Sequence, residues 1–337
     1  MKPLLPNTYV LNNKYLQSII SPSTDIIDYN FTSEQVHKLN LLQILRPDIY
    51  FNKNLSEEEF FDLSKKYYQK LIDEEIIYKS EKEYFLYRID SENHSQTGLI
   101  SLLNIQDYIN RNIKPHEKIL VSKGKERADQ LSKVKFQLSP IYLFYDDENI
   151  DLNLDIHHDK KPIIKFKSGK YTHSIYKTNT DFSGINFKEL FVADGHHRIE
   201  GFAQLDVDKD TKFLSILFPK SKCLNLSYNR SIKFPKDYKK DSFLTDLRKY
   251  FHAEELKYHE KIERFFVIYF EGKFFKIDLK DNYSSNGADC IDFGEFVLKE
   301  ILNIYDETSD ERVEFVPPTL GTDYLINQVD TGITDLS

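Results

Sequence analysis

The residues best suited to chemistry stand together in the middle of the chain, as Asp194, Gly195, His196, His197 and Arg198. The apolar run 190–193 before them is typical of a buried strand, and residues 196–204 have the pattern of a helix. Gly195 permits a backbone conformation and a close approach that a side chain would obstruct. The first N–H groups of a helix favour an anion, and imidazole and guanidinium groups add donors. The sequence therefore predicts a turn that binds a phosphate or a nucleotide.

Two other interpretations of this turn stay open. In the first, Asp194 caps the helix and the two histidines are merely solvated. In the second, His196 and Glu200 share a helix face and hold a metal ion together with Asp194. A further ligand would then come from the loop His157-His158-Asp159. Mg²⁺ held by carboxylates and substrate phosphates fits this composition better than a dedicated transition-metal site.

A second charged cluster precedes the turn in the sequence. It begins with Lys114-Pro115-His116-Glu117 and continues with Lys123, Lys125, Glu126 and Arg127. Most charge runs are solvated surface, and this one gains interest only beside a phosphate site. A carboxylate next to a phosphate either binds Mg²⁺ or accepts a proton from an attacking hydroxyl.

The elements that position these residues alternate between strands and helices. A helix is predicted over 56–72, with Ser56 and Glu59 as a capping box, and others near 106–111, 123–135, 196–204, 242–251 and 293–304. Strands are predicted at 84–89, 97–103, 141–145, 163–166, 171–176, 190–193, 213–218, 265–270 and 274–279. No element is predicted for the tail 317–337. The pattern indicates an α+β (mixed α/β) protein.

Length and composition limit the protein class. The 337 residues predict two domains, perhaps three, and 40% hydrophobic residues exclude a disordered chain. The net charge of −8 argues against a protein that binds duplex nucleic acid, and no apolar run is long enough for a membrane-spanning helix. Two cysteines are too few for a disulfide framework. With no signal-peptide pattern at the N-terminus, we expect a cytoplasmic protein.

Over most of its length the chain resembles the bacterial family catalogued as domain of unknown function 1015. The resemblance rests on an ordered set of motifs: Thr97-Gly98-Leu99, Asp107-Tyr108, His116-Glu117, Pro140-Ile141, the run 172–176, the run 193–198 and Asn229-Arg230. The sequence departs from that family pattern at Ile119, where threonine is expected, and at Glu126, where aspartate is expected.

The stretch 113–218 also resembles the free serine kinases of the ParB/sulfiredoxin-like fold. Their order is a Pro-His-Glu loop, a charged helix, a Pro-Ile strand, and a strand that runs into Asp-Gly-His-His-Arg. The resemblance implies a ParB/sulfiredoxin-like nucleotide-binding core over 111–235. An N-terminal α/β region, 1–110, and a C-terminal α/β region, 236–337, would elaborate it.

The activity that this resemblance implies is phosphoryl transfer from ATP or ADP, with Mg²⁺, to the hydroxyl of a free amino acid, L-serine first. Glu117, Asp194 and His196 would be catalytic, Glu117 as the base. Asp194 and Glu117 would hold Mg²⁺. The nucleotide and its phosphates would contact His116, Gly195, His197, Arg198, Lys123, Arg127 and Arg230.

Two other functions are compatible with the same residues. A phosphatase or other hydrolase would use the same phosphate turn with water as the acceptor. A nucleotide-binding regulatory protein would bind without turnover, but the sequence contains no recognisable nucleic-acid-binding module. The expected partners are therefore a small-molecule substrate and a nucleotide, without nucleic acid or membrane. A homo-oligomer stays open as an alternative to a single chain.

Overall fold

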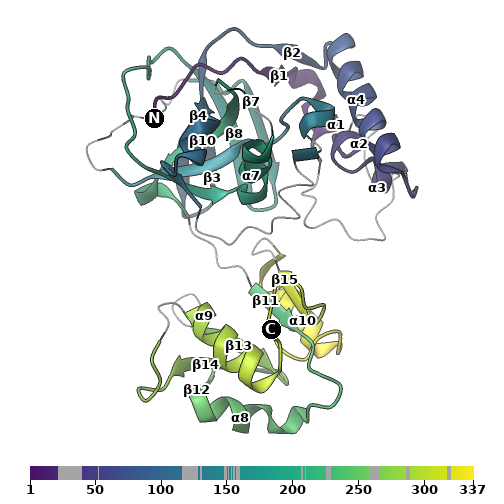
Figure 1. Cartoon of the computed structure of the whole chain (residues 1–337), viewed down its shortest axis with the longest axis vertical. Coiled ribbons are helices and arrows are strands. Elements are labelled where there is room, and N and C mark those ends of the chain that lie inside the picture. Colours follow the sequence, from purple (N-terminus) through teal and green to yellow (C-terminus); the bar gives the residue numbers. More distant parts are fainter. Residues whose placement is uncertain are drawn as a thin grey trace. The chain divides into compact units, whose positions relative to one another are not determined.

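The computed structural model divides the chain into two compact units, residues 1–224 and 225–337 (Figure 1). The described residues are 1–21, 40–51, 53–115, 128–129, 131–147, 150, 152, 154, 156, 160–205, 208, 210–224, 229–257, 266–285, 289–316 and 320–337. Within these ranges no helix is long and apolar enough to cross a membrane. Each unit has an apolar core of its own.

A mixed eight-stranded sheet forms the centre of the first unit. Its strands are β3 (Tyr84–Asp90), β4 (Ser95–Asn104), β5 (Ile113–Lys114), β6 (Ile141–Tyr145), β7 (Ile164–Ser168), β8 (Tyr171–Thr178), β9 (Leu190–Asp194) and β10 (Lys212–Pro219). Their spatial order is β5-β9-β6-β10-β4-β3-β8-β7. The pairs β5–β9 and β6–β10 are parallel, and the other neighbours are antiparallel. The predicted mixed α/β class is confirmed.

One face of this sheet carries the main core. Ile141, Leu143 and Tyr145 alternate along β6 and are buried, as side chains of period two must be when one face is covered. Helix α7 (His196–Gln204) packs on this face through Ile199 and Phe202, which belong to the same buried cluster. The helix that follows the Asp-Gly turn is therefore held by the core beneath the sheet.

The opposite face of the sheet is rich in aromatic rings. Phe144 of β6 and Phe191 of β9 stack with their ring centroids 5.1 Å apart. The Phe218 ring lies so close to Gly98 that a Cβ there would come within 2.8 Å of it. Glycine at this position therefore makes room for the ring on the neighbouring strand.

Helix α4 (Glu57–Asp73) begins with the predicted capping box. The Glu59 N–H donates to the Ser56 hydroxyl over 3.3 Å, and the Ser56 N–H donates to the Glu59 carboxylate over 2.8 Å. Tyr67 and Leu71, one helical turn apart, pack in a cluster with Ile19 and Ile44. The smaller elements of this unit are β1 (Tyr9–Leu11), η1 (Asn13–Tyr15), α1 (Leu16–Ile19), α2 (Leu42–Leu45), α3 (Pro47–Phe51), β2 (Ile77–Lys79), α5 (Ile105–Ile109) and η4 (Lys220–Lys222).

The second unit combines two small sheets with short helices. Its strands are β11 (Asn229–Ile232), β12 (Phe251–Leu256), β13 (Val267–Phe270), β14 (Lys273–Leu279) and β15 (Val313–Val316), in the orders β12-β14-β13 and β11-β15. Its helices are η5 (Lys240–Ser242), α8 (Phe243–Tyr250), α9 (Asp289–Phe293), η7 (Gly294–Ile301) and α10 (Gly321–Asp330). The hairpin predicted around Glu271-Gly272 is present, and both turn residues have positive φ.

Two expectations for the second unit need correction. The helix predicted over 293–304 is a π-helix, η7, which follows the short α9. The tail, for which no element was predicted, contains α10. Val329 of α10 packs with Tyr269 and Phe274, so contacts with the hairpin stabilise a helix whose sequence is rich in polar residues.

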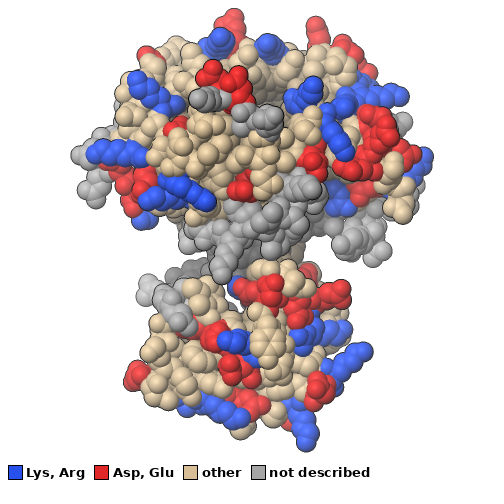
Figure 2. Space-filling model, in the orientation of Figure 1, with Lys and Arg blue, Asp and Glu red and all other residues tan. Residues whose placement is uncertain are grey.

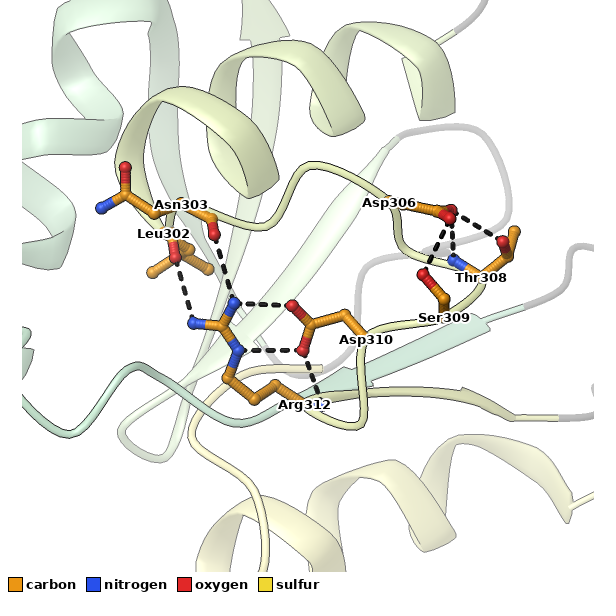
Figure 3. A network of polar contacts seen from close by, with 7 residues as sticks. All are labelled: Leu302, Asn303, Asp306, Thr308, Ser309, Asp310 and Arg312. Atoms are coloured by element: carbon orange, nitrogen blue, oxygen red, sulfur yellow. Dashed lines mark hydrogen bonds and ion pairs between the residues drawn. The ribbon is translucent and has the colours of Figure 1, made fainter.

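Arg312 closes the carbonyl end of the π-helix (Figure 3). Its guanidinium donates to the carbonyl oxygens of Leu302 and Asn303 over 3.4 and 3.2 Å, and makes a two-pronged contact with the Asp310 carboxylate at 2.9 and 2.6 Å. Hydrogen bonds from Arg312 hold the pKa of the Asp310 carboxyl below its usual value. The contact satisfies carbonyl groups that a helix end leaves unpaired.

Candidate functional site

The predicted turn connects β9 directly to α7. Gly195 is the N-cap residue of α7 and has φ +97°, in the left-handed region that favours glycine. The N-cap position belongs to Gly195 and not to Asp194, whose carboxylate pairs with Arg198 instead.

Arg198 folds back over the turn. Its guanidinium donates to the Pro140 carbonyl oxygen over 2.6 Å and forms an ion pair with Asp194. A Cβ on Gly195 would lie 3.1 Å from the Arg198 Cζ. Gly195 thus serves twice, because it supplies the positive φ and leaves space for the guanidinium.

The groups of the turn differ in their access to solvent. The Asp194 side chain is 65% exposed and that of Arg198 is 30% exposed. His196 is only 5% exposed, and His197 is half-buried. The Nε2 atom of His196 and the Nδ1 atom of His197 are both shielded from water. A carboxylate, a guanidinium and two imidazoles are therefore concentrated on one turn, at different depths.

A chain of polar side chains runs from this turn across the aromatic face of the sheet. Tyr142 pairs with Asp194 in the β6–β9 register, and the centre of its ring lies 6.3 Å from the centre of the Tyr87 ring. The Tyr87 hydroxyl lies 2.6 Å from Nδ1 of His173 on β8. Burial raises the pKa of both tyrosines and lowers the pKa of His173. All three groups therefore favour their neutral forms.

Reasoning from the sequence missed this chain. Strand alternation over 141–145 does place Tyr142 opposite Ile141 and Leu143, but it does not show which residues of distant strands meet it. His173 lies in one of the motifs that carry the family resemblance, and no role was assigned to it. The only signal was that a polar motif, 172–176, lies within a strand.

Helix α7 is also held by a contact with α5. The buried Tyr108 hydroxyl donates to Oε2 of Glu200 over 2.9 Å, and Gln204 donates to Oε1 over 3.1 Å. Glu200 is therefore engaged by neutral donors. Within the described ranges no three His, Cys, Asp or Glu side chains are close enough together to hold a metal ion. The metal set of His196, Glu200 and Asp194 does not assemble there.

Several predicted site residues lie outside the described residues. They are His116, Glu117, Lys123 and Arg127, together with the alternative metal ligands at 157–159. The residues just before this stretch are described. β5 is parallel to β9, with Lys114 opposite Phe191. Pro115 therefore follows β5 at the same end of the sheet at which Asp194 ends β9.

Arg230 belongs to the second unit. Its guanidinium makes a two-pronged contact with Glu307, at 2.6 and 2.8 Å, and lies 5.2 Å from the centre of the Phe315 ring. This pairing gives Arg230 a structural role within its own unit. A role in binding phosphate would require the contact with Glu307 to break.

Comparison with known proteins identifies one family. The family model described as "Protein of unknown function (DUF1015)" matches residues 3–302. No curated protein matches the sequence. Among solved structures, a conserved hypothetical protein from Pyrococcus furiosus is 11% identical, with a TM-score of 0.35, over 70% of this chain and 77% of the other. A variant of a free serine kinase in complex with ADP is 14% identical, with a TM-score of 0.36, over 70% and 74% of the two chains.

Proposed function

The chain belongs to the DUF1015 family of proteins of unknown function, and from this premise we propose that it is a nucleotide-dependent kinase. The reaction is transfer of a phosphoryl group from ATP or ADP to the hydroxyl of a free amino acid, with L-serine as the first candidate. The observation that carries the proposal is the turn at Gly195. There the start of α7, with glycine as its N-cap residue, brings two histidines and an arginine to the end of a central strand.

The turn supplies what phosphoryl transfer requires. The reaction depends on positioning and on neutralising charge, more than on covalent chemistry of the protein. Backbone N–H groups at the start of α7, with His196, His197 and Arg198, would surround the transferred phosphate. Arg198 is held in place by the Pro140 carbonyl, so little side-chain freedom is lost when a phosphate binds.

We assign the binding of the acceptor, serine, to the segment that follows Pro115. Glu117 would accept the proton of the serine hydroxyl, and His116 would lie near the nucleotide phosphates. Support comes from the parallel pairing of β5 and β9, because the chain leaves both strands at the same end of the sheet. Lys123 and Arg127 would add positive charge to this segment.

A divalent cation suits the carboxylates of this site. Asp194 presents a largely exposed carboxylate beside the turn, and carboxylate oxygens are ligands that Mg²⁺ prefers. Asp194 and Glu117 would hold the ion. When bound, Mg²⁺ would neutralise charge on the transferred phosphate. The proposal also keeps 111–235 as a ParB/sulfiredoxin-like catalytic core and the cytoplasm as its compartment.

The test is a search for phosphorylated product, in which a variant of the proposed base, Glu117, is measured beside the wild-type protein. The protein is incubated with Mg²⁺, ATP or ADP, and a panel of amino acids and small alcohols, and phosphorylated products are identified by mass spectrometry. We expect Glu117→Gln to retain nucleotide binding and to lose turnover by about 100-fold or more. Glu83→Gln, on the same unit and paired with Lys177, is the matched control and should keep full activity.

Three results would contradict parts of this proposal. Phosphorylation of serine by the Glu117 variant at the wild-type rate would exclude Glu117 as the base. No phosphorylated product with any acceptor would exclude the kinase. Release of phosphate from phosphoserine without nucleotide would favour a phosphatase that uses the same turn.

A further inference from the structure

A second cationic site lies on the first unit, apart from the turn at Gly195. Residues of α4 and of the segment 133–136 together line an open cavity of about 560 Å³. Its lining is Lys65, Lys66, Tyr68, Gln69, Lys133 and Phe136, with Val134 and Lys135 beside them. None of these residues belongs to the turn at 194–198, and the proposed kinase mechanism uses none of them.

Lysines supply the charged groups that line this cavity. Lys133 pairs with Glu57 at 2.6 Å and lies 4.6 Å from the centre of the Phe61 ring. Lys65, Lys66 and Lys135 are exposed, and none of the three forms an ion pair with any part of the chain that the structure describes. Among the described residues, these three ammonium groups line one cavity without an ion-pair partner, in a chain whose net charge is −8. They repel one another unless an anion lies between them.

The floor of the cavity is aromatic and held in place. Tyr68 and Phe136 stack with centroids 4.0 Å apart and planes at 19°. The Tyr9 ring meets Tyr68 edge-on at 6.0 Å, and Tyr68 and Phe136 pack against the cluster around Tyr67 and Leu71. The site therefore combines stacked aromatic rings with exposed ammonium groups, which suits a ligand with both phosphates and a flat ring.

We propose that this lysine cavity binds a short chain of phosphates, carried by a nucleoside polyphosphate or by inorganic tripolyphosphate. Lysine ammonium groups bind phosphate oxygens as point charges, and three of them match the charge of a di- or triphosphate. The volume lies within the range of small-ligand sites and is too small for a duplex. This inference is independent of the kinase proposal, because it depends on different residues.

The experiment measures binding of inorganic tripolyphosphate and of ADP to the full chain by isothermal titration calorimetry. In the double variant Lys65→Gln/Lys135→Gln we expect the affinity for tripolyphosphate to fall at least about tenfold, because charge-assisted contacts are lost. Lys70→Gln is the matched control. Lys70 lies on the same helix but outside the cavity, and it pairs with Glu74.

Two comparisons identify the source of the phosphates. If ADP binds more tightly than tripolyphosphate, and Phe136→Leu removes that advantage, the ligand is a nucleotide whose base stacks on the floor. If tripolyphosphate binds more tightly and Phe136→Leu has no effect, the ligand is inorganic. In either case binding should weaken as salt rises.

The proposal is overturned if neither probe binds the wild-type chain, or if the double variant binds both as well as the Lys70 control does. A short polyglutamate peptide that binds as tightly as tripolyphosphate would also overturn it, because the cavity would then select charge and not phosphate. Wild-type turnover in the double variant would leave the kinase proposal standing, so the two proposals fail separately.

Discussion

The absence of a side chain at Gly195 determines the shape of the candidate site. Positive φ is costly for alanine, and a Cβ would crowd the Arg198 guanidinium at 3.1 Å. We expect Gly195→Ala to destabilise the protein by about 1–3 kcal/mol and to abolish turnover. The measurements are a urea titration followed by circular dichroism and the kinase assay.

Gly184 provides the matched control for this substitution. It lies in the same unit, and a Cβ there would meet nothing within 4 Å. Gly184→Ala should change stability by less than about 0.5 kcal/mol. Equal effects of the two substitutions would mean that the conformation of Gly195 does not matter.

The buried His173 should make the stability of the protein depend on pH. Burial lowers its pKa below the ordinary value of 6.5, so the unfolded chain takes up the proton at a higher pH than the folded chain. The stability that neutral His173 contributes is therefore present above about pH 6.5 and is lost as the pH falls towards the folded-state pKa. His173→Gln keeps a polar partner for the Tyr87 hydroxyl and does not titrate. It should reduce the loss of stability between pH 7 and pH 5, as measured by urea titrations, and an unchanged loss would contradict this role.

At the scale of elements, the site depends on how α7 is fixed between the sheet and α5. Tyr108→Phe removes the hydroxyl that donates to Glu200 and leaves that carboxylate with one fewer donor. We expect a loss of stability of about 1–2 kcal/mol. As a positioning residue, Tyr108 should affect the KM for nucleotide more than the affinity for serine. Tyr171→Phe, which removes a hydroxyl on β8, is the control, and equal effects in both variants would exclude a positioning role.

The sequence predicted best the elements whose pattern is local. Strand 141–145 and helix 196–204 have the predicted bounds, because alternation, the Gly turn and the buried helix face are all visible in a single segment. The π-helix was not predicted, since its backbone pairing over five residues leaves no distinct pattern of side chains. Helix α10 was missed because its stability comes from packing against the hairpin.

The candidate site was likewise predictable only where its residues are adjacent in the sequence. Its five-residue turn follows from the residues themselves, whereas Tyr87 and His173 reach it only through pairings between strands far apart in the sequence. The ion pair of Asp194 with Arg198 was not predicted either. It is a local contact over four residues, and the capping interpretation of Asp194 concealed it.

At the scale of the whole molecule, the net charge of −8 hides local differences of sign. On the visible face of each unit, acidic and basic side chains are interspersed (Figure 2). Against this mixed background, the turn at 196–198 gathers two imidazoles and a guanidinium, and the cavity beside α4 gathers four lysines. The volume of the cavity lies within the range of small-ligand sites.

Phosphorus NMR of the full chain with Mg²⁺, nucleotide and L-serine tests the central claim most directly. The account predicts that an O-phosphoserine resonance grows as the terminal phosphate of ATP or ADP disappears, and that neither change occurs without the protein. The Glu117→Gln and Gly195→Ala variants should show neither change. Disappearance of the nucleotide with release of inorganic phosphate alone, or no change with the wild-type protein, would contradict the account.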